Sequence, residues 1–143
     1  MDYKLELVLI PVSDVDRAKK FYLEQAGFVL IVDTPIGPDQ RVVQVVPPGS
    51  ACAIGFGTGL TSAAPGAAQG LHLVVSDILA ARAELTERGV AVSGVRHLQD
   101  GTWVDGPHPE RENYESFADF TDPDGNIWIL QEVDRSKAEH GSD

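Results

Sequence analysis

Apolar residues along the chain recur either as short runs typical of strands or at the spacing of about 3.6 residues typical of helices. Each change between the two patterns marks a boundary between a strand and a helix. Residues 5–12 form an apolar run interrupted by Glu6, which predicts a strand. Ser13 and Asp14 follow at once, and their side-chain oxygens can cap a helix. Helical spacing then predicts an amphipathic helix that ends at Gly27 in a left-handed turn. The apolar face of this helix consists of Val15, Ala18, Phe21, Tyr22 and Ala26.

Three strands are predicted after this helix, at residues 28–34, 41–48 and 51–57. The turn signals PIGPD and PPGS separate them. A segment rich in small residues, 58–70, follows and is expected to be a surface crossing with little structure of its own.

The second half of the chain repeats the plan of the first. The stretch Val12-Ser13-Asp14-Val15 recurs as Val75-Ser76-Asp77-Ile78, and a second amphipathic helix runs from there to Gly89. Next we expect a strand at 90–96, a long polar loop at 97–114, and two strands at 115–120 and 127–133. Each half therefore reads as strand, helix and three strands.

Internal repetition of this kind means that neither half buries its sheet face alone, so the two halves should share one structure. We expect a single domain over residues 1–143, with one module at 4–60, a second at 69–133 and a polar tail at 134–143.

Composition and charge argue against nucleic acid and membranes as partners. The 22 acidic and 11 basic side chains give a net charge of −11, which would repel a nucleic-acid backbone. No segment approaches the roughly 20 apolar residues that span a bilayer, so no membrane partner is expected. Together with the absence of a basic and apolar leader this predicts a cytoplasmic protein. A single cysteine, Cys52, allows neither an intrachain disulfide nor a cysteine-based metal site.

Several of these stretches resemble a known family. They are PVSDVDRAKKFY after the first strand, GF after the first helix, VVSDILAARAELTERGV in the second half, and above all FADFTDPDGNIWILQEV. Together they resemble the vicinal oxygen chelate superfamily, also called the glyoxalase, bleomycin-resistance and extradiol dioxygenase family. The resemblance covers about residues 4–133.

The resemblance implies an α+β fold of two tandem βαβββ modules, whose curved mixed sheets surround a ligand cavity, and usually a homodimer. This scaffold hosts isomerases, epimerases, dioxygenases, thiol transferases and drug-binding proteins. Function therefore has to be argued from the site and not from the fold.

The resemblance also indicates where a metal would bind. Metal-dependent members carry a His near the start of the first strand of a module, and a Glu three residues after the Asn or Tyr of the DPDG(N/Y) turn. Carried over to this sequence, these positions are Leu7, Gly70 and Ile129. None of them offers a nitrogen or oxygen donor on its side chain. We therefore expect no metal and no other cofactor.

Strand alternation indicates which side chains face the cavity, because successive residues point to opposite faces. Leu7 and Leu9 fall on the face opposite the first helix, and His72 on the face opposite the second. Asp119 and Gln131 are expected to share the face of His72, giving a small polar group within an apolar pocket. Each has a plainer interpretation: a hydrogen-bonded structural histidine, a solvated carboxylate at a sheet edge, and a glutamine that bonds to a neighbouring strand.

Aromatic residues add to this picture. Phe56 is expected to line the pocket, whereas Trp128 has the parity of Leu130 and is expected in the core. Trp103 and Tyr114 lie in the polar loop at 97–114, which is a candidate lid suited to a planar or apolar ligand. The alternative is a solvated loop clamped by Trp103. The two histidines of this loop, His97 and His108, do not have the spacing of a metal pair.

The sequence thus favours a metal-independent member that binds a small, partly apolar organic molecule as a homodimer. One alternative is a metal-independent lyase or isomerase that uses His72 as its acid and base. Another is a metal-dependent glyoxalase-like enzyme, so whether the protein is an enzyme stays open. The predicted ligand-binding residues are His72, Asp119, Gln131, Leu7, Leu9, Phe56, Trp103 and Tyr114.

Overall fold

The computed structural model describes residues 1–136, and the chain forms two compact units. The first unit comprises Met1–Gln69 together with Asp122–Asn126, and the second comprises Gly70–Thr121 and, of the described residues that follow, 127–136. Most of the polar tail expected at 134–143 lies outside the described residues. None of the helices among the described residues is long and apolar enough to cross a membrane.

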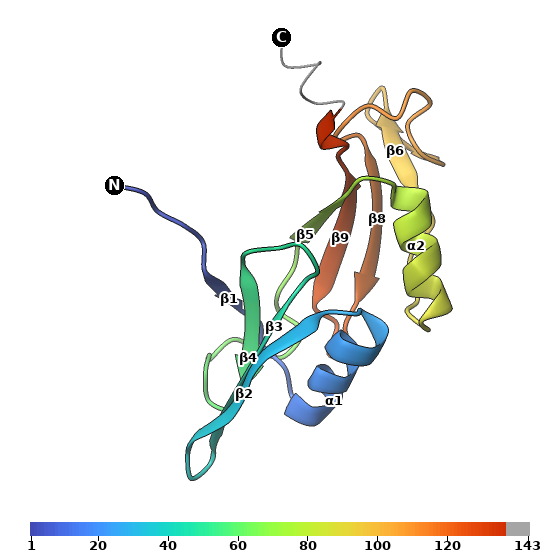
Figure 1. Cartoon of the computed structure of the whole chain (residues 1–143). Helices are drawn as coiled ribbons and strands as arrows, with labels where there is room; N and C mark the ends of the chain where they lie inside the picture. The colour runs from blue at the N-terminus through green and yellow to red at the C-terminus, as the bar shows by residue number, and fades with distance from the viewer. Residues whose placement is uncertain (137–143) are drawn as a thin grey trace. The chain divides into compact units, whose positions relative to one another are not determined.

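The first unit contains one sheet of four strands and one helical segment (Figure 1). Strand β1 pairs in parallel with β4, and the other neighbours in the order β1-β4-β3-β2 are antiparallel. The elements are β1 (Leu7–Leu9), α1 (Val15–Lys20), η1 (Phe21–Gln25), β2 (Val29–Gly37), β3 (Gln40–Val46) and β4 (Ala53–Gly57).

The helical segment of this unit begins and ends where the sequence predicts. Asp14 caps α1 by accepting a hydrogen bond from the backbone N–H of Arg17 at 3.0 Å. The π-helical turn η1 continues α1, and Gly27 then adopts a φ of 78°. Tyr22 is fully buried and its ring lies 5.6 Å from that of Phe56. The helix therefore covers one face of the first sheet, and its predicted apolar face is confirmed.

The turn Asp122–Asn126 belongs to the first unit although it lies in the second repeat. Asp122 accepts hydrogen bonds from the backbone N–H groups of Asp124 and Asn126, each at 2.9 Å. The Asn126 amide donates to the carbonyl of Pro11 at 2.8 Å, and the Tyr22 hydroxyl donates to Asp122 at 2.7 Å. The Asp124 carboxylate accepts from Ser13 and Arg17, so each polar side chain of DPDGN has a partner in the first unit.

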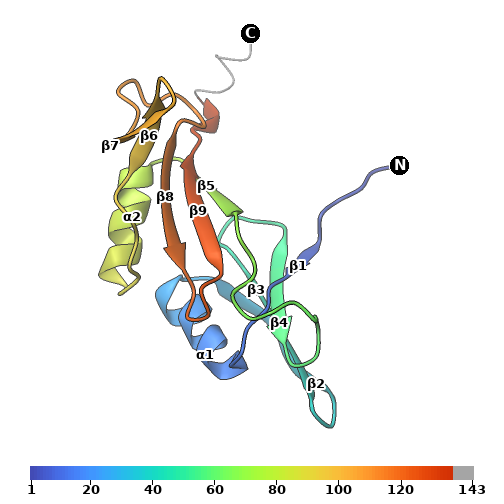
Figure 2. The same cartoon turned by 180° about the vertical axis from the view of Figure 1, so that it is seen from behind.

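The second unit repeats the plan with one additional strand. Its sheet has the order β5-β9-β8-β6-β7, with β5 and β9 parallel and the other neighbours antiparallel. Helix α2 lies along one face of this sheet (Figure 1), and β7 is labelled at its edge in Figure 2. The elements are β5 (Leu71–Val75), α2 (Ile78–Glu87), β6 (Arg96–Gln99), β7 (Thr102–Asp105), β8 (Ser116–Thr121) and β9 (Ile127–Glu132).

Two predictions for the second half are wrong. Residues 90–95 form no strand, and part of this segment is bonded to the helix instead: Arg82 of α2 donates to the carbonyls of Ser93 and Val92, at 2.7 and 3.2 Å. Residues 97–114 are not one long loop either. A hairpin of β6 and β7 takes up the first part, with Asp100 and Gly101 both at positive φ in its two-residue turn.

The core of the second unit lies between its sheet and α2. Trp128 is 1% exposed and stacks on Phe120 with ring centres 6.2 Å apart, so its predicted place in the core is confirmed. Ile78 at the start of α2 is also fully buried. The fold is therefore α+β, and the prediction of two βαβββ modules with mixed sheets is confirmed, with β7 as an addition to the second.

Candidate functional site

The second sheet has one face covered by α2 and one that is not, and we call the latter the open face. Burial alternates along β9, where Trp128, Leu130 and Glu132 are buried while the residues between them are half-exposed. Directly paired residues of neighbouring strands share a face, so the register identifies the rest. The open face includes His72, Val74, Arg96, Leu98, Trp103, Asp105, Phe117, Asp119, Ile129 and Gln131.

His72 and Gln131 meet on the open face. The Nδ1 atom of His72 lies 3.2 Å from Oε1 of Gln131, and the Nε2 atom of Gln131 donates to the backbone carbonyl of Tyr114 at 3.2 Å. The pair joins β5, β9 and the segment before β8. The imidazole is exposed in this unit, so its ring is accessible from the open face.

Asp119 lies on the same face but has a different partner. Its carboxylate accepts a charge-assisted hydrogen bond from Arg96 at 2.8 Å. The guanidinium of Arg96 also lies over the ring of Trp103, 5.0 Å from its centre, and Phe117 meets that ring edge-on at 5.6 Å. His72 is therefore paired with a neutral amide, whereas the carboxylate of Asp119 is paired with an arginine.

The open face thus offers a ligand two kinds of contact side by side. Trp103 is 50% exposed and its ring is held by Phe117 and Arg96, which presents a fixed aromatic surface. Ile129 pairs with both His72 and Asp119 and provides apolar surface between the two polar groups. Such a face can stack a planar group and hydrogen-bond its polar edge.

Other predicted site residues fall elsewhere. Leu7 and Leu9 lie in the first unit, on the sheet face that also carries Gly55, where an added Cβ would lie 3.1 and 3.0 Å from their side chains. Tyr114 is 48% exposed at a φ of 70°, and its hydroxyl accepts a hydrogen bond from Arg135. The prediction that Phe56 lines a pocket is wrong, because its ring is fully buried against Tyr22.

Sequence reasoning missed Arg96 and Phe117. Phe117 lies two residues before Asp119 on β8, so the strand alternation that places Asp119 on the open face also places Phe117 there. Arg96 is different, because its place beside Asp119 depends on the pairing of β6 with β8, where Arg96 is opposite Phe117. No local pattern in the sequence specifies that register.

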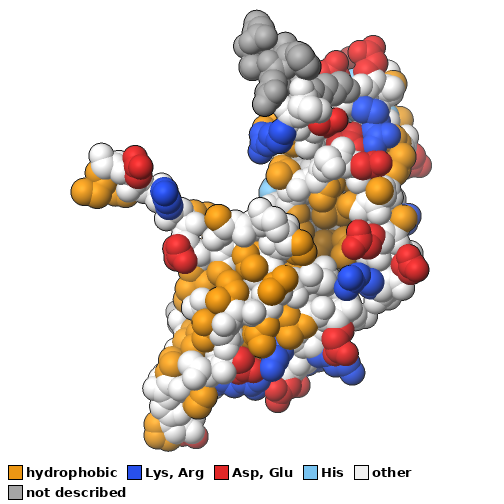
Figure 3. Space-filling view, viewed as in Figure 1, with side chains coloured by type: hydrophobic (Ala, Val, Ile, Leu, Met, Phe, Trp, Pro, Cys, Tyr) orange, Lys and Arg blue, Asp and Glu red, His pale blue; other side chains and the backbone are white. Residues whose placement is uncertain are grey.

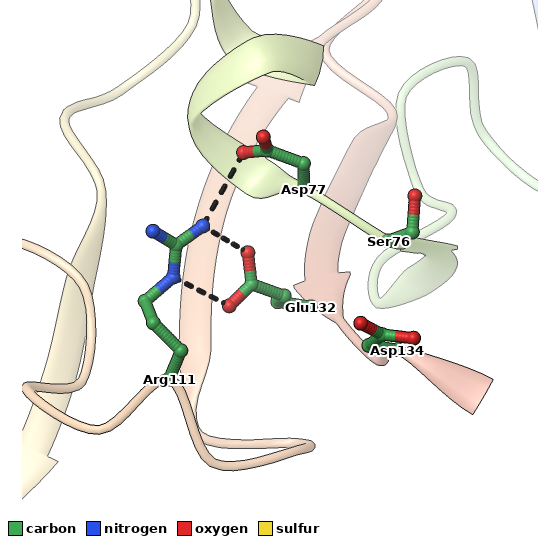
Figure 4. A pocket seen from close by; sticks show the side chains of 5 residues that line it. All are labelled: Ser76, Asp77, Arg111, Glu132 and Asp134. Atoms are coloured by element: carbon green, nitrogen blue, oxygen red, sulfur yellow. Dashed lines mark hydrogen bonds and ion pairs between the residues drawn. The ribbon is translucent and has the colours of Figure 1, made fainter. Parts of the chain in front are cut away.

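A second cluster of charges lies at the start of α2, in a hollow of about 180 Å³ (Figure 4). Arg111 donates from Nε and one terminal nitrogen to the two carboxylate oxygens of Glu132, at 2.8 and 2.5 Å, and reaches Asp77 at 3.3 Å. Glu132 also accepts from the backbone N–H of Ile78 at 2.8 Å. These hydrogen bonds, led by that from Arg111, hold the pKa of Glu132 below its usual range.

This cluster anchors structure. Arg111 has a φ of 53°, and the segment around it is bonded to β9 and to the residues after β9. The Tyr114 N–H donates to the backbone carbonyl of Glu132, and Asn113 exchanges two hydrogen bonds with Asp134. Residues 106–115 are therefore fastened to the end of the sheet at several points. Glu132 is part of this structural anchor.

With this geometry in view, comparisons with known proteins identify the family. The sequence model of the Glyoxalase/Bleomycin resistance protein/Dioxygenase superfamily matches residues 4–130. The chain belongs to this superfamily.

Several known proteins are similar to this chain in sequence, and two of them are also similar in structure. An antibiotic binding protein, TnmS3 from Streptomyces sp. CB03234, is 35% identical with a TM-score of 0.71, over 92% of this chain and 96% of that one. A glyoxalase/bleomycin resistance protein from the same organism is 36% identical with a TM-score of 0.68, over 90% and 99%. The uncharacterized protein YetH of Bacillus subtilis (strain 168) is 26% identical over 87% of this chain and 94% of its own length.

The metal chemistry of the superfamily does not fit the residues present here. Leu7 and Ile129 carry hydrocarbon side chains and Gly70 carries none, so the three positions provide no donor. The part of the chain that the structure describes also contains no group of three or more His, Cys, Asp or Glu placed to hold a metal ion.

Proposed function

We propose that the protein binds a small, partly apolar organic molecule on the open face of the second sheet, without a metal at the superfamily's usual positions. The observation that carries the proposal is the exposed ring of Trp103, held between Arg96 and Phe117 and followed across the sheet by Ile129 and His72. Small-molecule sites are lined mainly by apolar and aromatic side chains with a few fixed polar groups, and this face carries both kinds of side chain. The similarity to an antibiotic binding protein supports an antibiotic-like ligand.

Isothermal titration of the purified protein with bleomycin, which the family description names, tests this proposal. The account predicts saturable binding that weakens about fivefold to thirtyfold in Trp103→Ala, because a stacked aromatic contact contributes on the order of 1–2 kcal/mol. Val104→Ala is the matched control, since Val104 is the next residue on the strand and points to the opposite face. Equal affinities of the two variants would contradict a site at Trp103.

A second candidate function is a metal-independent lyase or isomerase, and the exposed His72 favours it because its imidazole is oriented by Gln131 and accessible. His72→Ala separates the two functions. A catalyst would lose turnover of a bound compound with little loss of affinity, whereas a binding protein has no turnover to lose. Product analysis of a compound that binds, with wild type and His72→Ala side by side, gives the answer.

We also propose that the protein forms a homodimer. Hydrophobic side chains gather on the surface of the first unit (Figure 3), and those exposed there include Leu9, Val29, Leu30, Ile31 and Ile36. Apolar surface of this kind is typical of an interface. Sedimentation equilibrium of wild type and Ile31→Asp is the test, with a wild-type dimer that the variant weakens as the expected result. A monomeric wild type would refute the proposal.

A cytoplasmic location stays a prediction from the sequence.

A further inference from the structure

The hydrogen bonds around Gln131 determine how its amide is turned. Its Nε2 atom lies 3.2 Å from the backbone carbonyl oxygen of Tyr114, which can only accept a hydrogen bond. The NH₂ group must therefore face Tyr114, because the opposite orientation would set two oxygens against each other. The amide oxygen is then the atom that faces Nδ1 of His72.

The orientation of the amide in turn determines the tautomer of the histidine. The Gln131 oxygen has only lone pairs to offer, so Nδ1 of His72 must carry the proton at their separation of 3.2 Å. In the neutral ring Nε2 is then unprotonated. Among the residues that the structure describes, none is hydrogen-bonded to this nitrogen, and the side chain is exposed on the open face.

The carbonyl at the start of this chain of bonds is itself fixed. The backbone N–H of Tyr114 donates to the backbone carbonyl of Glu132 at 2.8 Å, and the carbonyl of Tyr114 accepts from the side chain of Gln131. Gln131 and Glu132 are neighbours on β9. The backbone of His72 is fixed as well, because β5 pairs with β9 in a regular parallel register. The backbones of Tyr114, Gln131 and His72 are thus all held in place by main-chain hydrogen bonds.

We propose that Gln131 is a positioning residue that locks His72 in the Nδ1–H tautomer, so that Nε2 selects ligands that present a hydrogen-bond donor, a hydroxyl or an N–H group. The existence of a ligand on the open face rests on the proposed function, whereas the tautomer does not. Arg96 supplies hydrogen-bond donors on the same face. A hydrogen-bond acceptor of the ligand would therefore meet Arg96, and a hydrogen-bond donor of the ligand would meet His72. The ligand class that follows is a planar, partly apolar molecule with at least one hydroxyl or N–H group.

The first arm of the test measures the tautomer without any ligand. Long-range ¹H–¹⁵N correlation spectra of the ¹⁵N-labelled protein above the titration range of histidine distinguish a protonated ring nitrogen from an unprotonated one. We expect Nδ1 of His72 to be protonated in wild type, and a mixture of tautomers in Gln131→Leu, which offers no oxygen. Backbone amide spectra of the variant verify that it is folded. A wild-type His72 protonated on Nε2, or a Gln131→Leu spectrum identical to wild type, would overturn the inference.

The second arm compares 2-naphthol with 2-methoxynaphthalene, which has the same rings but no hydroxyl proton to donate. Because one neutral hydrogen bond contributes modestly in water, we expect wild type to bind 2-naphthol about threefold to tenfold more tightly, and Gln131→Leu to lose most of this preference. Equal binding of the two compounds by wild type overturns the selection by His72. Failure of both to bind counts against the proposed function as well, whereas a wrong tautomer overturns this inference alone, so the two failures are distinguishable.

Discussion

Removing Arg111 should destabilise the second unit through the carboxylate that it neutralises. The side chain of Glu132 is 3% exposed, and two of its three hydrogen bonds come from Arg111. Arg111→Met keeps most of the side-chain volume but leaves a buried negative charge with only the N–H of Ile78 as donor. Losing one partner of a buried, hydrogen-bonded ion pair costs roughly 2–5 kcal/mol.

The lower part of that range applies here. Arg111 is 36% exposed, so water partly screens the pair and can reach the carboxylate in the variant. We therefore expect Arg111→Met to lower the free energy of unfolding by about 2–3 kcal/mol at pH 7, and the thermal midpoint by roughly 5–10 °C. Arg88→Met is the matched control, since Arg88 is exposed at the end of α2, and it should change stability by less than about 0.5 kcal/mol.

The pH dependence of this difference tests the cause. Because the pKa of Glu132 is lowered in the folded wild type, its ion pair contributes stability above the unfolded pKa of about 4.3 and loses it as the pH falls through the folded value. In Arg111→Met, burial instead raises the pKa of Glu132, so the folded variant takes up a proton readily in acid. The gap between the two proteins should therefore be widest near neutral pH and close as the pH falls towards 4.

Urea unfolding followed by circular dichroism at pH 4, 5, 6 and 7 gives the measurement. A double variant, Arg111→Met with Glu132→Leu, removes the buried charge as well and should recover a large part of the lost stability. If Arg111→Met costs less than about 0.5 kcal/mol, or if its cost does not depend on pH, the reasoning about the buried carboxylate is wrong.

Three further predictions concern the first unit and metal content. Gly57→Ala should destabilise by roughly 3 kcal/mol or more, because the added Cβ would lie 1.9 Å from the carbonyl oxygen of Arg41, whereas Gly94→Ala has open space and should be nearly neutral in the same unfolding assay. Tyr22→Phe loses the buried 2.7 Å bond to Asp122 and should cost about 1–3 kcal/mol by urea unfolding, and a neutral result would contradict that role. Elemental analysis of freshly purified protein should find no metal at a fixed ratio per subunit, and thermal unfolding should be unchanged by a chelator, whereas a stoichiometric metal would refute the assignment from Leu7, Gly70 and Ile129.

Local patterns were sufficient to predict most of the fold. Both helix starts follow from a Ser-Asp pair, and Asp14 and Asp77 do accept the expected backbone hydrogen bonds. Both helix ends follow from a glycine, and Gly27 and Gly89 have positive φ. Such features need only a few neighbouring residues. The hairpin of β6 and β7 also had a local signal, the Asp100-Gly101 pair, which the polar character of its surroundings obscured.

The site was less predictable because it depends on pairing between distant strands. Alternation along single strands correctly placed His72 and Gln131 on one face, and the structure brings their side chains together. It could not show that Asp119 would be matched by Arg96 and not by His72, since that outcome depends on the register between β6 and β8. The burial of Phe56 has a related cause, because it depends on the helix residue Tyr22 that packs against its ring, and Tyr22 is distant from it in the sequence.

The central claim is that the open face of the second sheet binds a planar, partly apolar molecule. Titration of ¹⁵N-labelled protein with 2-naphthol, followed in ¹H–¹⁵N spectra, tests it most directly, because the indole N–H of Trp103 and the side-chain amide of Gln131 each give a separate signal. The account predicts saturable shifts concentrated on Trp103, Gln131 and His72. Shifts confined to the charged hollow around Arg111 or to the first unit, or no shifts at all, would contradict it.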